Sequence, residues 1–272
     1  MQHKCLLVGV CLLSALTIVA PVASAADNDA LDRIVATGII RVAVPDNFPP
    51  FGDLGSDGKL HGYDIDVAAL VADALGVKPD LIPVPSTDRI AALTGGKVDL
   101  VISTLGKDAD REKLIEFSVA YEPFFSGVFG PSDLPVSNPN DLAGKKVGVT
   151  RDTIEDRVLT NLAPATADIK RYDDNARTGL AYLAHETELI ATGNVVAADV
   201  LAKSPMKKTK MKFLLKNSPS YIGLAKNQPD LLARINAILA AARKDGSLNR
   251  ISEHWLKAPL GDPEQPDWVS IQ

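Results

Sequence analysis

Short apolar runs rich in Val and Ile alternate along the chain with longer stretches of helical period. The runs predict strands at residues 39–44, 81–84, 98–103, 147–150, 169–172, 189–192 and 211–215. The longer stretches predict helices at residues 64–75, 87–93, 109–115, 154–162, 176–183 and 230–244. Strand and helix in alternation indicate an α/β fold with mostly parallel sheets, and apolar runs without interruption indicate strands covered on both faces.

The stretch GYDIDVAALVADALGV contains the clearest predicted helix. Apolar residues recur at helical spacing, and Gly76 ends the pattern. Asp64 and Asp66 lie at its start, where acidic side chains favour the helix dipole. We therefore interpret these two aspartates as helix caps and not as catalytic groups.

Two stretches divide the chain into two units. Residues 119–127 and 216–223 are candidate crossings, and between them lies a second α/β unit of a normal domain size. We predict a discontinuous first lobe of residues 26–122 and 219–272, and a second lobe of residues 123–218. Two crossings between two lobes would form a hinge with a cleft beside it.

The first residues resemble a secretory signal peptide. Lys4 precedes an apolar stretch, and the small residues Ala23-Ser24-Ala25 follow it, which predicts a signal peptide of residues 1–25 and a mature chain from about Ala26. An uncleaved membrane anchor is the alternative, but no basic flank follows the apolar stretch. Cleavage would remove both cysteines, Cys5 and Cys11, and with them thiol chemistry.

Charge and histidine spacing exclude several classes of function. The formal net charge of −5 argues against nucleic acid as a partner. The three histidines beyond the signal peptide show no metal-ligand spacing, and the chain has no phosphate loop and no G-x-S-x-G elbow. We therefore expect no metal and no cofactor. The basic run Lys203–Lys212 is either a solvated loop or a docking surface for a partner.

Polar or aromatic residues follow four of the predicted strands. In open α/β sheets, ligands bind at the carboxyl ends of the strands, so these residues are candidates for a common site. Such a set suits a small polar ligand with a negative group. The candidates at or just after the ends of the four strands are Asp46 and Phe48; Ser103 and Thr104; Thr150, Asp152 and Thr153; and Thr192.

Arg111 is the candidate for binding the negative group. Its planar guanidinium can bind a carboxylate with two hydrogen bonds, and Asp108 is placed to cap the helix that carries it. The alternative is a surface pair of Arg111 with Asp108 or Glu112. Phe48 could stack on a ligand, but its pattern with Phe51 favours a place in the core.

Four motifs in order resemble family 3 of the extracellular solute-binding proteins, the periplasmic receptors of polar amino acid ABC transporters. They are GYDIDVAALVADALGV, AALTGGKVDLVIST, DREKLIEFSVAY and DLAGKKVGVT, and the resemblance covers roughly residues 30 to 258. It implies the type II periplasmic binding protein fold, in which two lobes joined by two hinge strands close on the ligand. It also implies delivery to a permease in the inner membrane by a monomeric periplasmic protein without enzymatic activity.

The resemblance also assigns roles to single residues. Arg111 matches the arginine that binds the α-carboxylate of the ligand, and Phe48 matches an aromatic residue that stacks on it. Ser103, Thr104 and Leu105 match the loop beside the arginine, and Thr150 and Thr153 match the loop of the second lobe that completes the carboxylate site.

Several positions depart from the family pattern. Gly106 stands where a hydroxyl is usual, and Asp152 where a glycine is usual. The two family acids that bind an ammonium group align with Pro45, just before Asp46, and with Gly193, just after Thr192. Because a buried ammonium needs a charged or well-bonded partner, Asp46, Asp88 or Asp152 takes this role, or the ligand is not a standard α-amino acid.

Two rival functions remain open from the sequence. Cyclohexadienyl dehydratases resemble the same family, and Asp152 and Glu155 are the nearest candidates for a general acid. A sensor lobe that reports to a membrane kinase is the other rival, and it needs a partner protein. We favour the transport receptor, with a polar amino acid or a close derivative as ligand.

Overall fold

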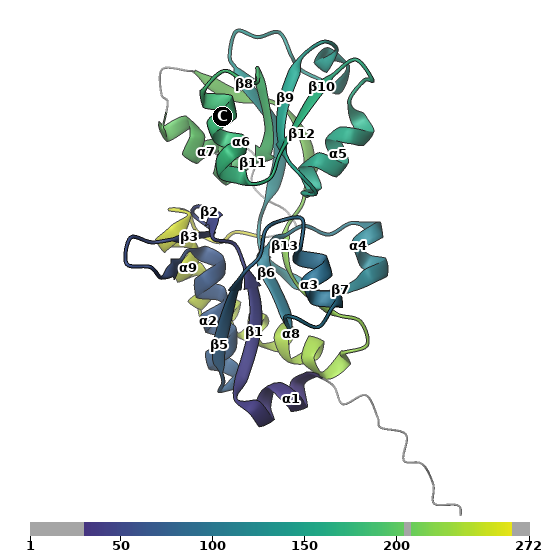
Figure 1. The fold of residues 1–272 in the computed structure, drawn as a ribbon. Coiled ribbons are helices and arrows are strands. Elements are labelled where there is room, and N and C mark those ends of the chain that lie inside the picture. Colours follow the sequence, from purple (N-terminus) through teal and green to yellow (C-terminus); the bar gives the residue numbers. More distant parts are fainter. Residues whose placement is uncertain (1–29, 204–207, 263–272) are drawn as a thin grey trace, which may run out of the picture.

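The computed structural model describes residues 30–203 and 208–262, which form two α/β lobes joined by two passages of chain (Figure 1). The predicted signal peptide and part of the basic run Lys203–Lys212 lie outside the described residues. The two-lobed α/β fold predicted from the sequence is confirmed.

The first lobe is built on a five-stranded sheet of order β5-β1-β6-β13-β7. These strands are β1 (Ile39–Val44), β5 (Lys78–Pro83), β6 (Leu100–Leu105), β7 (Ile115–Glu122) and β13 (Ser220–Ala225). Its helices are α1 (Ala30–Thr37), α2 (Tyr63–Leu75), α3 (Arg89–Thr94), α4 (Ala109–Leu114), α8 (Pro229–Lys244) and α9 (Ser247–Trp255). A small sheet of β2 (Asn47–Phe48), β3 (Gly52–Leu54) and β4 (Leu60–His61) lies beside them.

The second lobe repeats this plan with the order β10-β9-β11-β8-β12. Its strands are β8 (Phe125–Pro131), β9 (Lys146–Thr150), β10 (Asp168–Tyr172), β11 (Leu189–Gly193) and β12 (Thr209–Asn217). Its helices are α5 (Ile154–Leu162), α6 (Asn175–Leu183) and α7 (Asn194–Lys203), with a 3-10 turn, η1 (Pro139–Leu142).

Each of the two five-stranded sheets is mixed, where the sequence predicted mostly parallel sheets. In the first lobe β5, β1 and β6 are parallel, and β13 pairs antiparallel with both β6 and β7. In the second lobe β10, β9 and β11 are parallel, and β8 pairs antiparallel with both β11 and β12. The antiparallel strands adjoin the passages between the lobes, and β7, β8 and β13 were missing from the predicted strands.

The chain crosses between the lobes from β7 to β8 and from β12 to β13 (Figure 1). The predicted lobe boundaries, after residues 122 and 218, fall in these two passages and stay a prediction. Strand β7 ends at the first crossing, and β6 runs in the same direction as β7 because both pair antiparallel with β13, so the carboxyl ends of the parallel strands of the first lobe face the second lobe. Strand β8 begins at this crossing and pairs antiparallel with β11, so the carboxyl ends of the parallel strands of the second lobe face the first. The fold therefore places the polar residues after these strands at a common interface.

Helix α2 packs its apolar face against the first sheet, as its period predicts. Val67, Ala68 and Val71 are fully buried in the core of this lobe. The aspartates at its start are not caps: the N-cap is Gly62, and no side chain caps the helix. Asp64 is instead fully buried in a hydrogen-bonded cluster, and Asp66 accepts a hydrogen bond of 2.6 Å from the Trp255 indole.

Candidate functional site

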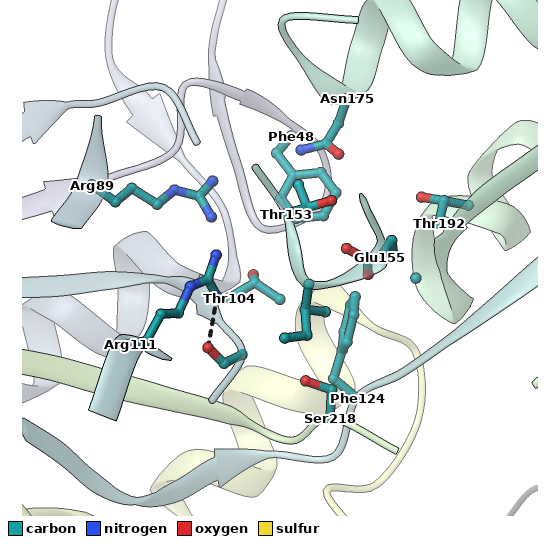
Figure 2. A pocket seen from close by; sticks show the side chains of 13 residues that line it. Phe48, Arg89, Thr104, Arg111, Phe124, Thr153, Glu155, Asn175, Thr192 and Ser218 are labelled. Atoms are coloured by element: carbon teal, nitrogen blue, oxygen red, sulfur yellow. Dashed lines mark hydrogen bonds between the residues drawn. The ribbon is translucent and has the colours of Figure 1, made fainter. Parts of the chain in front are cut away.

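A cavity lies between the two lobes, at the carboxyl ends of strands from both sheets (Figure 2). It encloses about 420 Å³ of space free of protein atoms, including its opening to solvent. Its lining consists of Phe48, Arg89, Thr104, Gly106, Arg111, Phe124, Thr153, Ile154, Glu155, Asn175, Thr192, Gly193 and Ser218.

Arg111 lies in α4 and its guanidinium connects the two lobes. One terminal nitrogen, Nη1, donates to the Gly106 carbonyl at 2.7 Å, and Nη2 donates to the Asp152 carbonyl of the second lobe at 2.8 Å. Asp108 caps the helix as predicted, because its carboxylate accepts from the Asp110 and Arg111 amides. The Arg111 side chain is buried, and burial lowers its pKa from the usual value, although the guanidinium stays charged.

The surface-pair alternative for Arg111 has little support in this geometry. Its Nε lies 3.9 Å from the Asp108 carboxylate, which is longer than a hydrogen bond, and Glu112 pairs with Lys107 instead at 2.9 Å. Two of the five guanidinium N–H groups bind backbone carbonyls, and these bonds hold the group against the cavity. The remaining N–H groups are suited to a carboxylate.

Arg89 is a second arginine in the same cavity, and the sequence analysis did not select it. It lies in the first turn of α3, is 8% exposed, and points into the cavity beside Arg111 (Figure 2). Burial, and then the positive charge of Arg111, lower the pKa of Arg89 to about 10. At neutral pH the cavity therefore holds two guanidinium cations.

Glu155 contributes the carboxylate of the cavity. It lies in the first turn of α5 in the second lobe, is 7% exposed, and accepts a hydrogen bond of 2.7 Å from Ser126. The three aspartates considered as ammonium partners do not line the cavity: Asp46 is half-buried, and Asp88 and Asp152 are exposed. Among the described residues, Glu155 is the acidic side chain that lines it.

Two aromatic rings bound the cavity. Phe48 is buried and lines it, whereas Phe51 is fully buried in the core, 4.9 Å from the Phe48 ring. Phe124 lies over Gly193: a Cβ built on this glycine would lie 1.9 Å from Cζ of the ring. The position where the family pattern has an acid therefore has no room for any side chain while Phe124 stays in place.

Thr104 lines the cavity, but its hydroxyl points to a buried cluster. The hydroxyl donates to Asp64 at 2.7 Å, and the Tyr121 hydroxyl donates to the same carboxylate at 2.5 Å. Thr104 has φ 45°, a left-handed conformation that costs energy for a β-branched residue. These bonds offset that cost and fix the loop before Arg111. Burial raises the pKa of Asp64 to about 6, although both hydrogen bonds act in the opposite direction.

The loop of the second lobe directs α5 at the cavity. Thr153 caps this helix: its hydroxyl accepts from the Asp156 amide at 3.3 Å and donates to the Thr150 carbonyl at 2.8 Å. The first N–H groups of a helix have no acceptor within it, so this end favours an anion. Thr150 does not reach the cavity, but its hydroxyl bonds Asn175, which does.

Half of the ten predicted site residues line the cavity, namely Phe48, Thr104, Arg111, Thr153 and Thr192. The other half lie behind or beside it. Ser103 and Leu105 are fully buried in strand β6, where their side chains alternate with those facing the cleft. Thr150 positions Asn175, and Asp152 contributes its carbonyl to Arg111 while its side chain is exposed. Asp46 is half-buried outside the cavity lining.

The lining residues that the prediction missed include Arg89, Phe124, Glu155, Asn175 and Ser218. Glu155 was considered only for the enzymatic alternative. Arg89, Glu155 and Asn175 lie in the first turn of a helix and Phe124 lies directly before a strand, positions at which a sequence shows no unusual signal. Arg89 follows the polar residues Thr87 and Asp88 at a helix start, a pattern typical of solvated side chains. Only its burial in the structure distinguishes Arg89 from a surface arginine.

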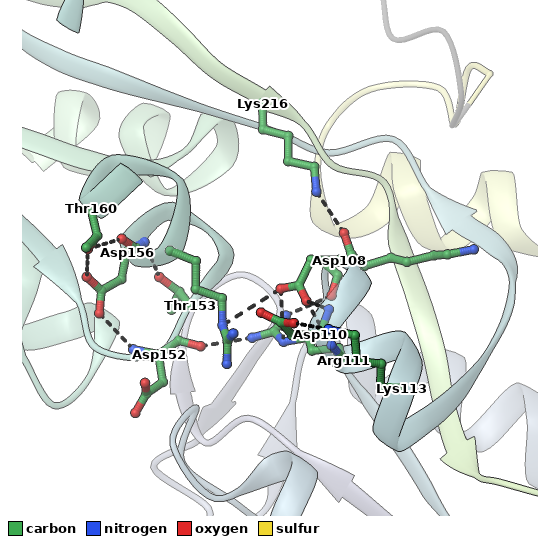
Figure 3. A network of polar contacts seen from close by, with 12 residues as sticks. Asp108, Asp110, Arg111, Lys113, Asp152, Thr153, Asp156, Thr160 and Lys216 are labelled. Atoms are coloured by element: carbon green, nitrogen blue, oxygen red, sulfur yellow. Dashed lines mark hydrogen bonds and ion pairs between the residues drawn. The ribbon is translucent and has the colours of Figure 1, made fainter. Parts of the chain in front are cut away.

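Polar contacts on the outer side of Arg111 also connect the lobes (Figure 3). The Lys216 ammonium in β12 donates to the Lys107 carbonyl at 2.7 Å. The Arg157 guanidinium lies 3.8 Å from the Asp108 carboxylate. Together with the bond from Arg111 to Asp152, these contacts join α4 and its preceding loop to the second lobe. The arrangement is that of a closed lobe pair.

The model of the bacterial extracellular solute-binding proteins, family 3, matches residues 40–258. The chain belongs to this family. The L-cystine-binding protein TcyJ of Escherichia coli (strain K12) is 29% identical over 243 residues, covering 88% of this chain and 90% of that protein. The crystal structure of the cysteine-binding protein from Campylobacter jejuni has a TM-score of 0.78 at 25% identity, covering 86% of this chain and 95% of that one.

An enzyme also occurs among the similar proteins. The cyclohexadienyl dehydratase of Pseudomonas aeruginosa is 30% identical over 109 residues, which cover 40% of this chain and 41% of the enzyme. This similarity is partial, whereas the similarity to the family's binding proteins extends over most of the chain.

The described residues contain no candidate for two other classes of site. No group of three or more His, Cys, Asp or Glu side chains within residues 30–203 and 208–262 is placed to hold a metal ion. In the same part of the chain, no helix has the length and apolar character that a membrane crossing requires.

Proposed function

We propose that this protein is the substrate-binding component of an ABC importer and captures an amino acid or a related small carboxylate. The observation that carries the proposal is the position of Arg111. Its guanidinium lines the cavity and binds a carbonyl of each lobe, at 2.7 and 2.8 Å, so that lobe closure completes the surroundings of this cation. Family membership and the named binding proteins support the same function.

In this proposal the α-carboxylate of the ligand binds the free N–H groups of Arg111 and the N-terminal end of α5. The first contact is made in the open form, from the first lobe. Closure then brings Thr153, Ile154 and Glu155 from the second lobe. The ligand stabilises the closed form because it contacts both lobes there and only one lobe in the open form.

The proposal extends to location and partners. The protein is exported by cleavage after Ala25 and works in the periplasm as a monomer whose lobes meet near residues 122 and 218. Its closed form then docks on a permease in the inner membrane. It performs no covalent chemistry and has no nucleic acid partner.

The test is calorimetry of the chain that begins at Ala26 against the twenty amino acids and simple mono- and dicarboxylates. We expect one chemical class to bind, and Arg111→Ala to abolish this binding while the far-ultraviolet circular dichroism stays unchanged. Lys113→Ala is the matched control, since Lys113 lies in the same helix and pairs with Asp110 on the surface. Normal binding by Arg111→Ala would overturn the proposed site.

A dehydratase is the second candidate, and one observation favours it. Glu155 is a buried carboxyl group in a cavity that also holds arginines, which could serve as a general acid beside a bound carboxylate. The partial similarity to cyclohexadienyl dehydratase is consistent with a dehydratase function. Incubation with prephenate and with arogenate decides it: turnover that disappears in Glu155→Gln would establish the enzyme and displace the receptor.

A further inference from the structure

The cavity contains more positive charge than one carboxylate requires. Arg89 comes from α3 and Arg111 from α4, two neighbouring helices of the first lobe, and both guanidinium groups point into the same space (Figure 2). Glu155, from the opposite lobe, is the acidic side chain in the described lining. The formal charge of the lining is therefore two positive groups against one negative group.

Arg89 differs from Arg111 in having no hydrogen-bond acceptor and no ion pair among the described residues, although the charge of the buried Asp64 carboxylate favours its protonated form. Arg111 donates hydrogen bonds to two carbonyls, whereas no described residue accepts a hydrogen bond or forms an ion pair with Arg89. Its Nε is buried without any acceptor. A guanidinium has five donors, and burying a charge without a partner is costly. An unpaired buried cation that faces a ligand cavity indicates that the ligand supplies its partner.

We propose that Arg89 forms a subsite for a second acidic group of the ligand, so that the cavity selects a dicarboxylic amino acid such as glutamate or aspartate. This inference rests on the proposed function and specifies its ligand. In the bound state Arg111 holds the α-carboxylate, Glu155 holds the ammonium, and Arg89 holds the side-chain carboxylate. In this arrangement each guanidinium faces one carboxylate of the ligand, and the ammonium faces Glu155.

The same arrangement disfavours other amino acids. A basic side chain would lie near two guanidinium groups in a dry cavity, where like charges repel strongly. A neutral side chain would leave Arg89 buried and unpaired. The alternative in which both arginines bind one carboxylate predicts no preference for an acidic side chain, so selectivity distinguishes the two arrangements.

The first experiment compares isosteric ligands on the unmodified protein. Calorimetry measures the affinities for glutamate and glutamine, for aspartate and asparagine, and for arginine, cysteine and cystine. We expect the better of the two acidic amino acids to bind at least about 30-fold more tightly than its amide, because truncation of a buried charge pair costs about that much or more. Equal or tighter binding of an amide, arginine, cysteine or cystine overturns the Arg89 subsite and leaves the proposed function standing. Failure of every amino acid and carboxylate to bind overturns the proposed function itself.

The second experiment removes the charge of Arg89. In Arg89→Gln we expect the affinity for the acidic amino acid to fall at least about 30-fold, with a much smaller change for its amide. The control is Arg151→Gln, which removes one positive charge from an exposed residue in the loop between β9 and α5 of the second lobe. An equal loss for the acid and its amide would show that both arginines bind one carboxylate, and would overturn the subsite. Arg89→Lys keeps a positive charge and should retain part of the selectivity for the acidic amino acid. This variant replaces Arg89→Gln in the experiment if Arg89→Gln does not fold.

Discussion

The ring of Phe124 occupies the space that a side chain at Gly193 would need. A Cβ at this glycine would lie 1.9 Å from Cζ of Phe124, and the ring packs edge-on against Phe51 with centroids 5.9 Å apart. Phe124 comes directly before β8, and Gly193 is the last residue of β11. Whether position 193 can carry an acidic side chain thus depends on an aromatic residue nearly seventy positions earlier in the chain.

The contact between Phe124 and Gly193 predicts how a methyl group added at position 193 changes the stability of the fold. Gly193→Ala should lower the free energy of unfolding by about 1 to 3 kcal/mol, because an overpacked site forces its neighbours to move. Thermal melting of the ligand-free protein measures the change. In the double variant Gly193→Ala with Phe124→Leu, part of the loss should be recovered, since leucine leaves the space that the methyl group needs. Strictly additive losses in the two single variants would contradict the coupling.

Lys216 offers a test of the closed arrangement. Its ammonium donates to the Lys107 carbonyl across the lobes at 2.7 Å, so Lys216→Met should favour the open form and weaken ligand binding by about tenfold. Calorimetry gives the affinity, and small-angle scattering with and without ligand gives the degree of closure.

The control for Lys216 lies in the same strand. Lys212 donates to the Leu134 carbonyl, also at 2.7 Å, but within the second lobe. Lys212→Met therefore removes the same kind of bond without affecting closure, and its ligand affinity should stay unchanged. Equal weakening in both variants would mean that Lys216 acts through the second lobe's stability and not through closure.

Glu155 should determine whether the ligand carries an ammonium group. If it binds the ammonium, Glu155→Gln should weaken binding of the amino acid at least about 30-fold, as expected for a buried charge pair that loses one partner. The matching dicarboxylate without an amine should lose nothing. Glu112→Gln is the control, because Glu112 pairs with Lys107 outside the cavity. Equal losses for both ligands would contradict the ammonium role.

Asp64 predicts a pH dependence of stability. Burial raises its pKa to about 6 in the folded protein, whereas the pKa of an aspartate in an unfolded chain is about 3.9. Between these values the folded state binds more protons than the unfolded state, so this group's contribution is greatest at low pH and is lost as pH rises towards 6.

The measurement is urea unfolding of the unmodified protein and of Asp64→Asn. The difference in unfolding free energy between them should be larger at pH 4.5 than at pH 7, in favour of the unmodified protein, by about 2 kcal/mol. Comparison of the two proteins removes the effect of carboxylates elsewhere. A difference that does not change with pH would contradict the raised pKa of Asp64.

The buried Asp64 cluster illustrates the limit of local patterns. Two aspartates at a helix start indicate caps, yet Asp64 binds Thr104 and Tyr121 in the core and holds the loop before Arg111. A helix start shows the same residues whether its acids face solvent or the core. The difference arises from which strands pack against the helix.

The sequence by itself determined the two-lobed α/β fold, the parallel strands with most of the helices, and one of the two arginines of the cleft, Arg111. Hydrophobic period depends on local geometry, so it predicts strands β1, β6 and β9 and helix α2 without knowledge of their neighbours. Arg111 could be selected because its signal is local too: it follows a buried strand, a polar loop and the cap Asp108.

Only the tertiary structure decided which charges face each other. Arg89, Arg111 and Glu155 lie on three helices from two lobes, and their meeting depends on sheet order and on closure of the lobes. The sequence does not distinguish an arginine that is buried from one that is solvated at the same position of a helical turn. Burial changes their energetics, because an unpaired charge is cheap in water and costly in a closed cavity. The ligand preference proposed for this site therefore follows from packing that no local pattern reports.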